Sequence, residues 1–342
     1  EATQDVIARI DSQLLSAGAL VLNAASIDNQ GRLQGNNVNV HAQTLRNAGQ
    51  IYSASEMVIA PSESLTNLLS GVIQSKQGLT LTTPNLSNDG LIQGGESSQI
   101  NATDSLHNSG KLLFAKELTL NGSDLVNTGF IQADAITQNV MTFDNQGTWR
   151  AQQQGSLTGD TLKNTGTLQA GNLTLTAHDV NNGGTVLGTS SVNVQSDTLS
   201  IDHDAALMSG GDLRVVSTVL DALGRIVALG DTTLNIINTF TGQNVVAAGK
   251  TLTVHTQGDL LNQNVMQGQA VNLHAGGALN NQGQITLGTG ESSFDAQRIT
   301  LDASGSVQGG GNIALTSASD ILVNGFTGTA GSLTLSAINN IL

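Results

Sequence analysis

Residues 162–177 read LKNTGTLQAGNLTLTA, and this stretch decides the fold because its pattern recurs along the chain. Its asparagine belongs to a set with nearly constant spacing, and all members but one have glycine two positions later. The set is Asn29, Asn47, Asn67, Asn88, Asn108, Asn127, Asn145, Asn164 and Asn182; Asn67 lacks the glycine. A fixed period marks a repeat architecture, and a period of about 19 residues fits one turn of a β-solenoid rather than a pair of helices.

Leucine and threonine alternate from Leu173 to Thr176, which is the two-residue period of a strand with one buried face. The alternation returns at residues 118–120, 192–194, 252–254, 271–273 and 333–335. We therefore predict an all-β fold, a right-handed parallel β-helix of roughly 18 turns with a period of about 19 residues.

The asparagine and the glycine are expected to form a corner of each turn. Glycine adopts positive φ without a steric penalty, and the asparagine amide bonds readily to nearby backbone. Amides stacked in successive turns can also bond one another in a ladder. The nine asparagines are thus predicted to be structural corner posts and not ligands.

The composition supports a solenoid and excludes several functions. Aromatic residues make up 2% of the chain, which is expected of a narrow interior with little room for rings, and there are two prolines. A net charge of −14 with 12 lysines and arginines argues against a nucleic-acid partner. No apolar run approaches the roughly 18 to 20 residues of a membrane span, so we expect no membrane insertion by this segment. The absence of cysteine excludes disulfides and thiolate metal sites.

No motif for catalysis, a cofactor or a metal is recognisable. His255 and His274 follow matching strands and are expected to stack on one face, without forming a metal site. Carbohydrate-active β-helices group carboxylates with basic residues on one face. Acids are spread thinly here and bases are scarce, so we predict that the chain is not an enzyme.

The repeat divides into a regular part, residues 1–195, and a divergent part, residues 196–342. The Asn-x-Gly pattern stops after Asn182 and returns clearly only at Asn281. In between lie the polar residues Asp202, His203, Asp204 and Arg225. Sequence drift within the repeat and the start of a partner-binding region both explain the change. If a binding determinant exists in this chain, we expect it within about residues 196–280, at these four residues.

The phrases at residues 125–133, LVNTGFIQA, and residues 168–177, LQAGNLTLTA, resemble the haemagglutinin repeats of filamentous haemagglutinin-like exoproteins. The resemblance covers nearly the whole chain, more loosely after about residue 195. It implies export by two-partner secretion through an outer-membrane β-barrel transporter. It also implies an extracellular location on the outer surface of a Gram-negative bacterium.

The resemblance further implies a non-catalytic filament segment that presents surface to a receptor or glycan on a target cell. The parent would be a contact-dependent growth inhibition effector, which carries a C-terminal toxin, or a host-cell adhesin. The repeat style favours the effector. A carbohydrate-active β-helix is the remaining alternative. Because the repeat is running near both ends without a recognisable cap, we expect an excerpt of a longer chain.

Overall fold

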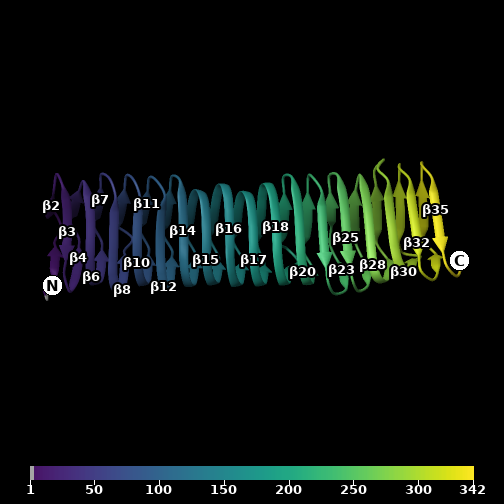
Figure 1. Ribbon diagram of the computed structural model, residues 1–342, viewed down its shortest axis with the longest axis horizontal. Helices are drawn as coiled ribbons and strands as arrows, with labels where there is room; N and C mark the ends of the chain where they lie inside the picture. The colour runs from purple at the N-terminus through teal and green to yellow at the C-terminus, as the bar shows by residue number, and fades with distance from the viewer. Residues whose placement is uncertain (1–3) are drawn as a thin grey trace. The chain divides into compact units, whose positions relative to one another are not determined.

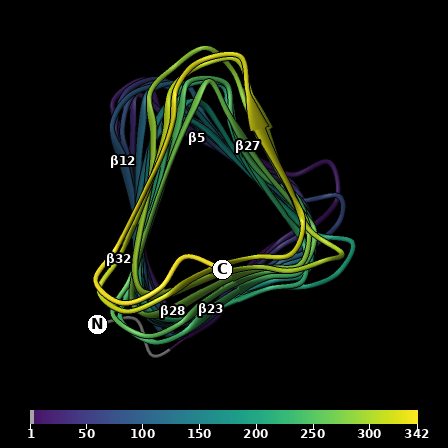
Figure 2. The same cartoon turned by 90° about the vertical axis from the view of Figure 1, so that its right-hand side faces the viewer.

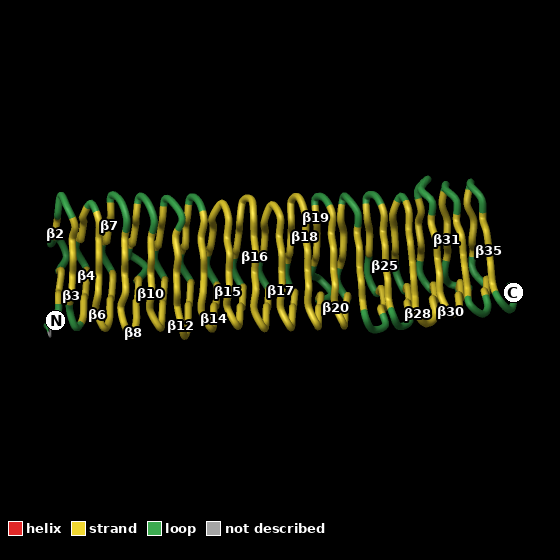
Figure 3. Tube along the Cα trace, in the orientation of Figure 1, coloured by secondary structure: helices red, strands yellow, loops and turns green. Residues whose placement is uncertain are grey.

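The computed structural model describes residues 4–342, and all their regular elements are β-strands. The described residues contain no helix, and hence none long and apolar enough to cross a membrane (Figure 3). The chain divides into two compact units, unit 1 (Glu1–Gly171) and unit 2 (Asn172–Leu342), with the boundary inside strand β17 (Thr167–Asn182). The units comprise about 17 turns with a period near 19 residues, which confirms the predicted parallel solenoid.

Unit 1 contains β1 (Val6–Ala8), β2 (Gln13–Leu15), β3 (Ala19–Asn23), β4 (Ser26–Asn29), β5 (Arg32–Gly35), β6 (Asn37–Asn47), β7 (Gln50–Ser53), β8 (Met57–Asn67), β9 (Val72–Ser75), β10 (Leu79–Asn88), β11 (Leu91–Gly94), β12 (Ser98–Asn108), β13 (Lys111–Phe114), β14 (Glu117–Asn127), β15 (Phe130–Asn145) and β16 (Thr148–Asn164).

Unit 2 contains β18 (Thr185–Ile201), β19 (Ala206–Ser209), β20 (Asp212–Ala222), β21 (Arg225–Ala228), β22 (Thr232–Ile236), β23 (Phe240–Gly242), β24 (Val246–Ala248), β25 (Thr251–Thr256), β26 (Leu260–Asn262), β27 (Val265–Gly268), β28 (Ala270–Asn281), β29 (Gln284–Leu287), β30 (Ser292–Leu301), β31 (Ser306–Gly309), β32 (Ile313–Ser317), β33 (Ile321–Val323), β34 (Phe326–Thr329) and β35 (Leu333–Ala337).

Within each unit, every strand pairs in parallel with the equivalent strand one coil away (Figure 1). In unit 1 this forms three sheets. The first contains β1, β4 and the ends of β6, β8, β10, β12 and β14, and the second contains β2, β5, β7, β9, β11 and β13. The third contains β3 and the starts of β6, β8, β10, β12 and β14. Unit 2 repeats the plan, for example in the series β19, β21, β24, β27, β29, β31 and β34. Each coil therefore has three sides, and Figure 2 shows this outline end-on for the coils of each unit.

The core is a set of inward-facing rows, one residue per coil. In the second sheet of unit 1 the row runs Leu33, Ile51, Ile73, Ile92, Leu112, Ile131 and Trp149, and each side chain is fully buried. Alternate residues of the same strands face outward, because successive side chains of a strand point to opposite faces.

The expectation that the interior has little room for large rings is wrong. Trp149 is fully buried, and space for its indole comes from Gly155, where a Cβ would lie 2.8 Å from the ring. The indole N–H donates to the side-chain oxygen of Gln138 at 3.0 Å. Gln138 itself replaces an apolar core residue, since its register neighbours are Leu120 and Leu157. A ring is accommodated where nearby residues are adapted to it.

The expected role of the corner glycines also needs correction. No glycine of the described residues has positive φ, and the positive value at a non-glycine residue is 68° at Asp11. Glycine is required instead by close approach between coils. A Cβ on Gly129 would lie 2.2 Å from the carbonyl oxygen of Gly110, and one on Gly147 would lie 2.2 Å from that of Gly129. These glycines thus form a column in which each backbone packs directly on the preceding coil.

Candidate functional site

The asparagines of unit 1 form a continuous buried ladder. From Asn29 to Asn145, each side-chain amide donates a hydrogen bond to the side-chain oxygen of the asparagine one coil later, at 2.7–2.8 Å. The members are Asn29, Asn47, Asn67, Asn88, Asn108, Asn127, Asn145 and Asn164, all with no exposed surface. Asn127 shows the full pattern: its amide also donates to the carbonyl oxygen of Thr148 at 3.2 Å. Both amide donors are satisfied, as burial of a polar group requires.

Unit 2 keeps the same corner position but fills it differently. Asn182 is buried, and its amide donates to the carbonyl oxygen of Ala206 at 3.1 Å. On the following coils, the residues in register at this corner position are Ile201, Ala222, Gly242, Asn262, Asn281, Leu301 and Val323. Apolar packing and glycine thus replace the amides between two asparagine segments.

Asn262 is a ladder member that sequence reasoning missed. Its amide donates to the side-chain oxygen of Asn281 at 2.8 Å and to the carbonyl oxygen of Gln284 at 3.1 Å. The Asn-x-Gly pattern does not identify it, because Asn264, not glycine, lies two positions later. Its spacing from Asn281, which matches the repeat period, was the available signal. Its own side-chain oxygen is buried without a hydrogen-bond partner, because Gly242 occupies the preceding coil.

Some corners are longer than Asn-x-Gly and close with a four-residue turn. An N–H donates to the carbonyl oxygen three residues earlier, at 2.7–3.0 Å, in Arg9–Ser12, Leu68–Gly71, Asp202–Ala205 and Asp302–Gly305. We call these four segments the long corners. At Leu68–Gly71 the long corner adds two residues, because glycine lies four positions after Asn67 instead of two, and the sequence separation from Asn67 to Asn88 is 21. In Figure 2 the long corners of unit 1 project from its outline as purple and blue loops.

Three of the predicted partner-binding residues lie at one long corner, and the fourth lies beside it on the next coil. Asp202, His203 and Asp204 form its exposed tip, and the His203 and Asp204 side chains are 84% and 101% exposed. The His203 ring nitrogen Nδ1 lies 3.1 Å from a carboxylate oxygen of Asp204. Arg225 is on the next coil, and its backbone N–H donates to the carbonyl oxygen of Ala205 at 3.1 Å. The four residues thus form one exposed polar surface, whose binding role stays a prediction.

The predicted histidine pair is confirmed as a stack. The rings of His255 and His274 have centroids 4.6 Å apart and are inclined by 9°. Asp295 continues the row on the next coil, with its carboxylate 3.4 Å from Nδ1 of His274. Across residues 4–342, no group of three or more His, Cys, Asp or Glu side chains could hold a metal ion.

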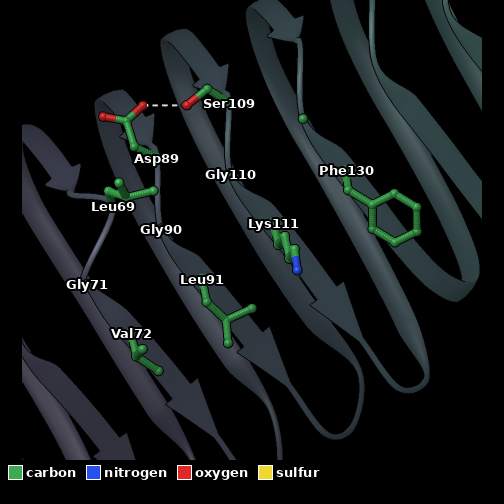
Figure 4. A pocket seen from close by; sticks show the side chains of 11 residues that line it. Leu69, Gly71, Val72, Asp89, Gly90, Leu91, Ser109, Gly110, Lys111 and Phe130 are labelled. Carbon is green, nitrogen blue, oxygen red and sulfur yellow. Dashed lines mark hydrogen bonds between the residues drawn. The ribbon is translucent and has the colours of Figure 1, made fainter.

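A groove of about 510 Å³ follows the glycine column of unit 1 from Gly71 to Gly129 (Figure 4). We call it the corner groove. The glycines form its floor because they carry no side chain. One wall is formed by the corner residues Leu69, Asp89 and Ser109, and the other by the outward residues Val72, Leu91, Lys111 and Phe130. The groove lies in the part of the chain predicted to be uniform. The sequence feature that could have indicated the groove is Asn67, which is the one member of the asparagine set without a glycine two positions later.

A second hollow, of about 480 Å³, brings acids and a base together at another edge of unit 1. Its lining includes Glu96, Lys116, Glu117 and Asp134, a grouping that was not apparent from the sequence. Glu96, Lys116 and Glu117 are exposed, and Glu117 accepts a hydrogen bond from Ser97 at 3.1 Å. A general acid or base is tuned to its task by burial or by a specific charged neighbour. Carboxylates surrounded by water are poorly suited to that task.

Comparison with known proteins finds a matching repeat family and several similar proteins. The model of the haemagglutinin repeat matches residues 2–60, 52–110, 97–170, 262–290 and 288–341. The chain is 42% identical over 332 residues to the tRNA nuclease CdiA of Escherichia coli (strain NC101), covering 96% of this chain and 10% of that protein. It is 34% identical over 329 residues to the deoxyribonuclease CdiA of Dickeya dadantii (strain 3937), covering 95% and 10%. The chain thus spans about a tenth of the length of these relatives. No solved structure gives a significant match.

Proposed function

The chain belongs to the haemagglutinin-repeat family, and from this premise we propose that it is a non-catalytic filament segment of a contact-dependent growth inhibition effector. The observation that carries the proposal is the repetition of one coil within each unit. Each coil buries its apolar face only against its neighbours, so coils can be added without changing the fold. Such a chain gains length and surface, whereas an active site requires groups that converge.

The activities in the names of the relatives, tRNA nuclease and deoxyribonuclease, are those of the relatives themselves. We assign neither activity to this segment, because it corresponds to about a tenth of each relative and none of its described acidic residues is buried. In this proposal the parent protein is exported through an outer-membrane transporter of a two-partner system. The segment then lies outside the cell, on the surface of a Gram-negative bacterium, where it supports and presents receptor-binding surface. The similarity to CdiA proteins favours this role over that of a host-cell adhesin.

The proposal is tested by removing one whole coil from the parent effector. Deleting residues 30–47 joins Asn29 directly to Ala48-Gly49 and so regenerates the Asn-x-Gly corner with the register intact. If the segment is a spacer, the shortened effector should still be displayed and should still inhibit target cells in co-culture.

The matched control is deletion of residues 30–38 alone, about half a coil. This deletion shifts every inward residue of the affected coil, because the side-chain period of a strand is two. It should abolish display. Loss of inhibition by the whole-coil deletion, with normal display at the surface, would contradict a spacer role.

A further inference from the structure

The outward row beside the corner groove changes chemistry over four consecutive coils. Val72, Leu91, Lys111 and Phe130 are register partners in succession. The same row is polar on either side, with Gln50 before and Thr148 after. Val72, Leu91 and Phe130 are half-buried, and Leu69 stands at the tip of its long corner with 86% of its surface exposed. An apolar patch of this kind on a polar face marks an interaction site.

The spacing of this row indicates which secondary structure a partner would need in order to contact every coil. Neighbouring coils are separated by about 4.8 Å, as are neighbouring strands in any sheet. Successive turns of an α-helix rise by about 5.4 Å, so four turns stay nearly in step with four coils. An extended peptide repeats a side chain on one face at intervals of about 6.6 Å and falls out of step within two coils. A helix can therefore place one side chain against each coil.

The positive charge of Lys111 in the groove favours an acidic side chain on that helix. Lys111 is exposed, and none of the ion pairs among the described residues includes its ammonium group. Asp89, on the opposite wall, accepts a hydrogen bond from the Ser109 hydroxyl (Figure 4). An acidic side chain on the partner would thus meet a cation between two apolar contacts. Charge complementarity of this kind fixes register and orientation.

We propose that the corner groove is a docking site for one amphipathic α-helix of a partner protein. Apolar side chains of the helix contact Val72, Leu91 and Phe130, and an acidic side chain faces Lys111. Helix-in-groove recognition uses anchors at positions i, i+4, i+7 and i+11, which lie on one helix face. A second copy of this segment is not the occupant, because residues 4–342 contain no helix.

The test measures binding of synthetic helical peptides to the complete 342-residue chain by fluorescence anisotropy. The peptides carry three leucines and one glutamate at the four anchor positions, with the glutamate third or second so that both helix directions are covered. Two controls are used, a scrambled peptide of the same composition and a strand-forming peptide of alternating valine and threonine. We expect saturable binding of one helical peptide and at least about tenfold weaker binding of both controls, the loss of one hot-spot contact.

Paired variants locate the site. Leu91→Glu introduces a charge into the groove wall and should weaken binding by about tenfold or more. Gln93→Glu adds the same charge at the next outward position of β11, outside the groove lining, and should leave affinity unchanged. Lys111→Glu should weaken binding of the acidic peptide, and replacing the peptide glutamate with lysine should restore it. Circular dichroism is used to check that each variant remains folded.

Three results would overturn the proposal. The first is that no helical peptide of either direction binds. The second is that the scrambled or strand-forming peptide binds as tightly as the helical one. The third is that Leu91→Glu and Gln93→Glu have equal effects. Because these measurements use the isolated chain, they are independent of whether the parent protein inhibits target cells.

Discussion

At the scale of single residues, each interior asparagine from Asn47 to Asn145 is bonded to two others, so their contributions to stability are coupled. Asn127 accepts from Asn108 and donates to Asn145. Asn127→Ala leaves both neighbours with an unpaired buried group and should lower the free energy of unfolding by about 1–3 kcal/mol. The double variant with Asn145→Ala should cost less than the sum of the single variants, because the shared hydrogen bond is lost only once. Denaturant unfolding of the three variants measures the difference.

The control for this coupling is a distant pair on the same ladder. Asn47→Ala and Asn145→Ala share no hydrogen-bond partner. Their effects should add to within about 0.5 kcal/mol. If the adjacent pair is equally additive, the amide-to-amide bonds contribute nothing measurable to stability.

A second prediction at this scale separates close approach from backbone conformation as the reason for the corner glycines. Gly129→Ala places a Cβ 2.2 Å from a backbone oxygen that cannot move aside, and should cost about 1–3 kcal/mol or more by overpacking. Gly18→Ala meets no heavy atom within 4 Å and, by restricting the unfolded chain, should be neutral or stabilising by up to about 1 kcal/mol. Thermal unfolding midpoints compare the two directly. Equal effects would rule out close packing as the constraint.

At the scale of the element, the long corners are insertions that the solenoid accommodates without changing its register. Deleting Leu69 and Ser70 joins Asn67-Leu68 to Gly71 and converts a long corner into Asn-x-Gly. Because loop length has little effect on stability, we expect the variant to unfold within about 1 kcal/mol of the parent chain. Circular dichroism and denaturant titration check this expectation.

The matched control removes two residues from the strand that follows this corner. Deleting Ile73 and Gln74 from β9 removes a fully buried side chain and the backbone hydrogen bonds of these residues to the neighbouring strands. It should cost at least the roughly 2–5 kcal/mol of a large-to-small core change. Similar losses for the two deletions would mean that the long corner is itself part of the packed structure.

Features that depend on neighbouring residues could be predicted from the sequence, whereas features that depend on contacts between coils could not. Alternation within one turn, as at Leu173 to Thr176, reveals a strand because the information is local. The corner groove depends on residues such as Leu91 and Phe130, which are far apart in the sequence and are brought into one row, with Lys111 between them, only by the register of the strands. Trp149 was unexpected in the core for a related reason, because Gly155, which makes room for it, is recognisable only in three dimensions.

At the scale of the whole molecule, the question is which exposed surface recognises a partner. The corner groove lies in unit 1, whereas Asp202, His203, Asp204 and Arg225 lie in unit 2. The two surfaces differ in chemistry, since one is largely apolar and the other is charged. Substitutions in the complete chain can therefore assign binding to one of them without cutting either unit.

The last prediction concerns the charged surface, where a change in the repeat pattern provides a distinct set of side chains. In the complete chain, Asp202→Asn, His203→Ala, Asp204→Asn and Arg225→Ala together should abolish binding of the labelled chain to target cells. All four residues are exposed, so the variant should keep the fold and the unfolding midpoint of the parent chain. The matched control is Asp302→Asn with Ser304→Ala at another long corner of unit 2, which should leave binding unchanged. Flow cytometry of target cells gives the readout. If the four-residue variant binds normally while Leu91→Glu does not, recognition resides in the corner groove and this prediction is wrong.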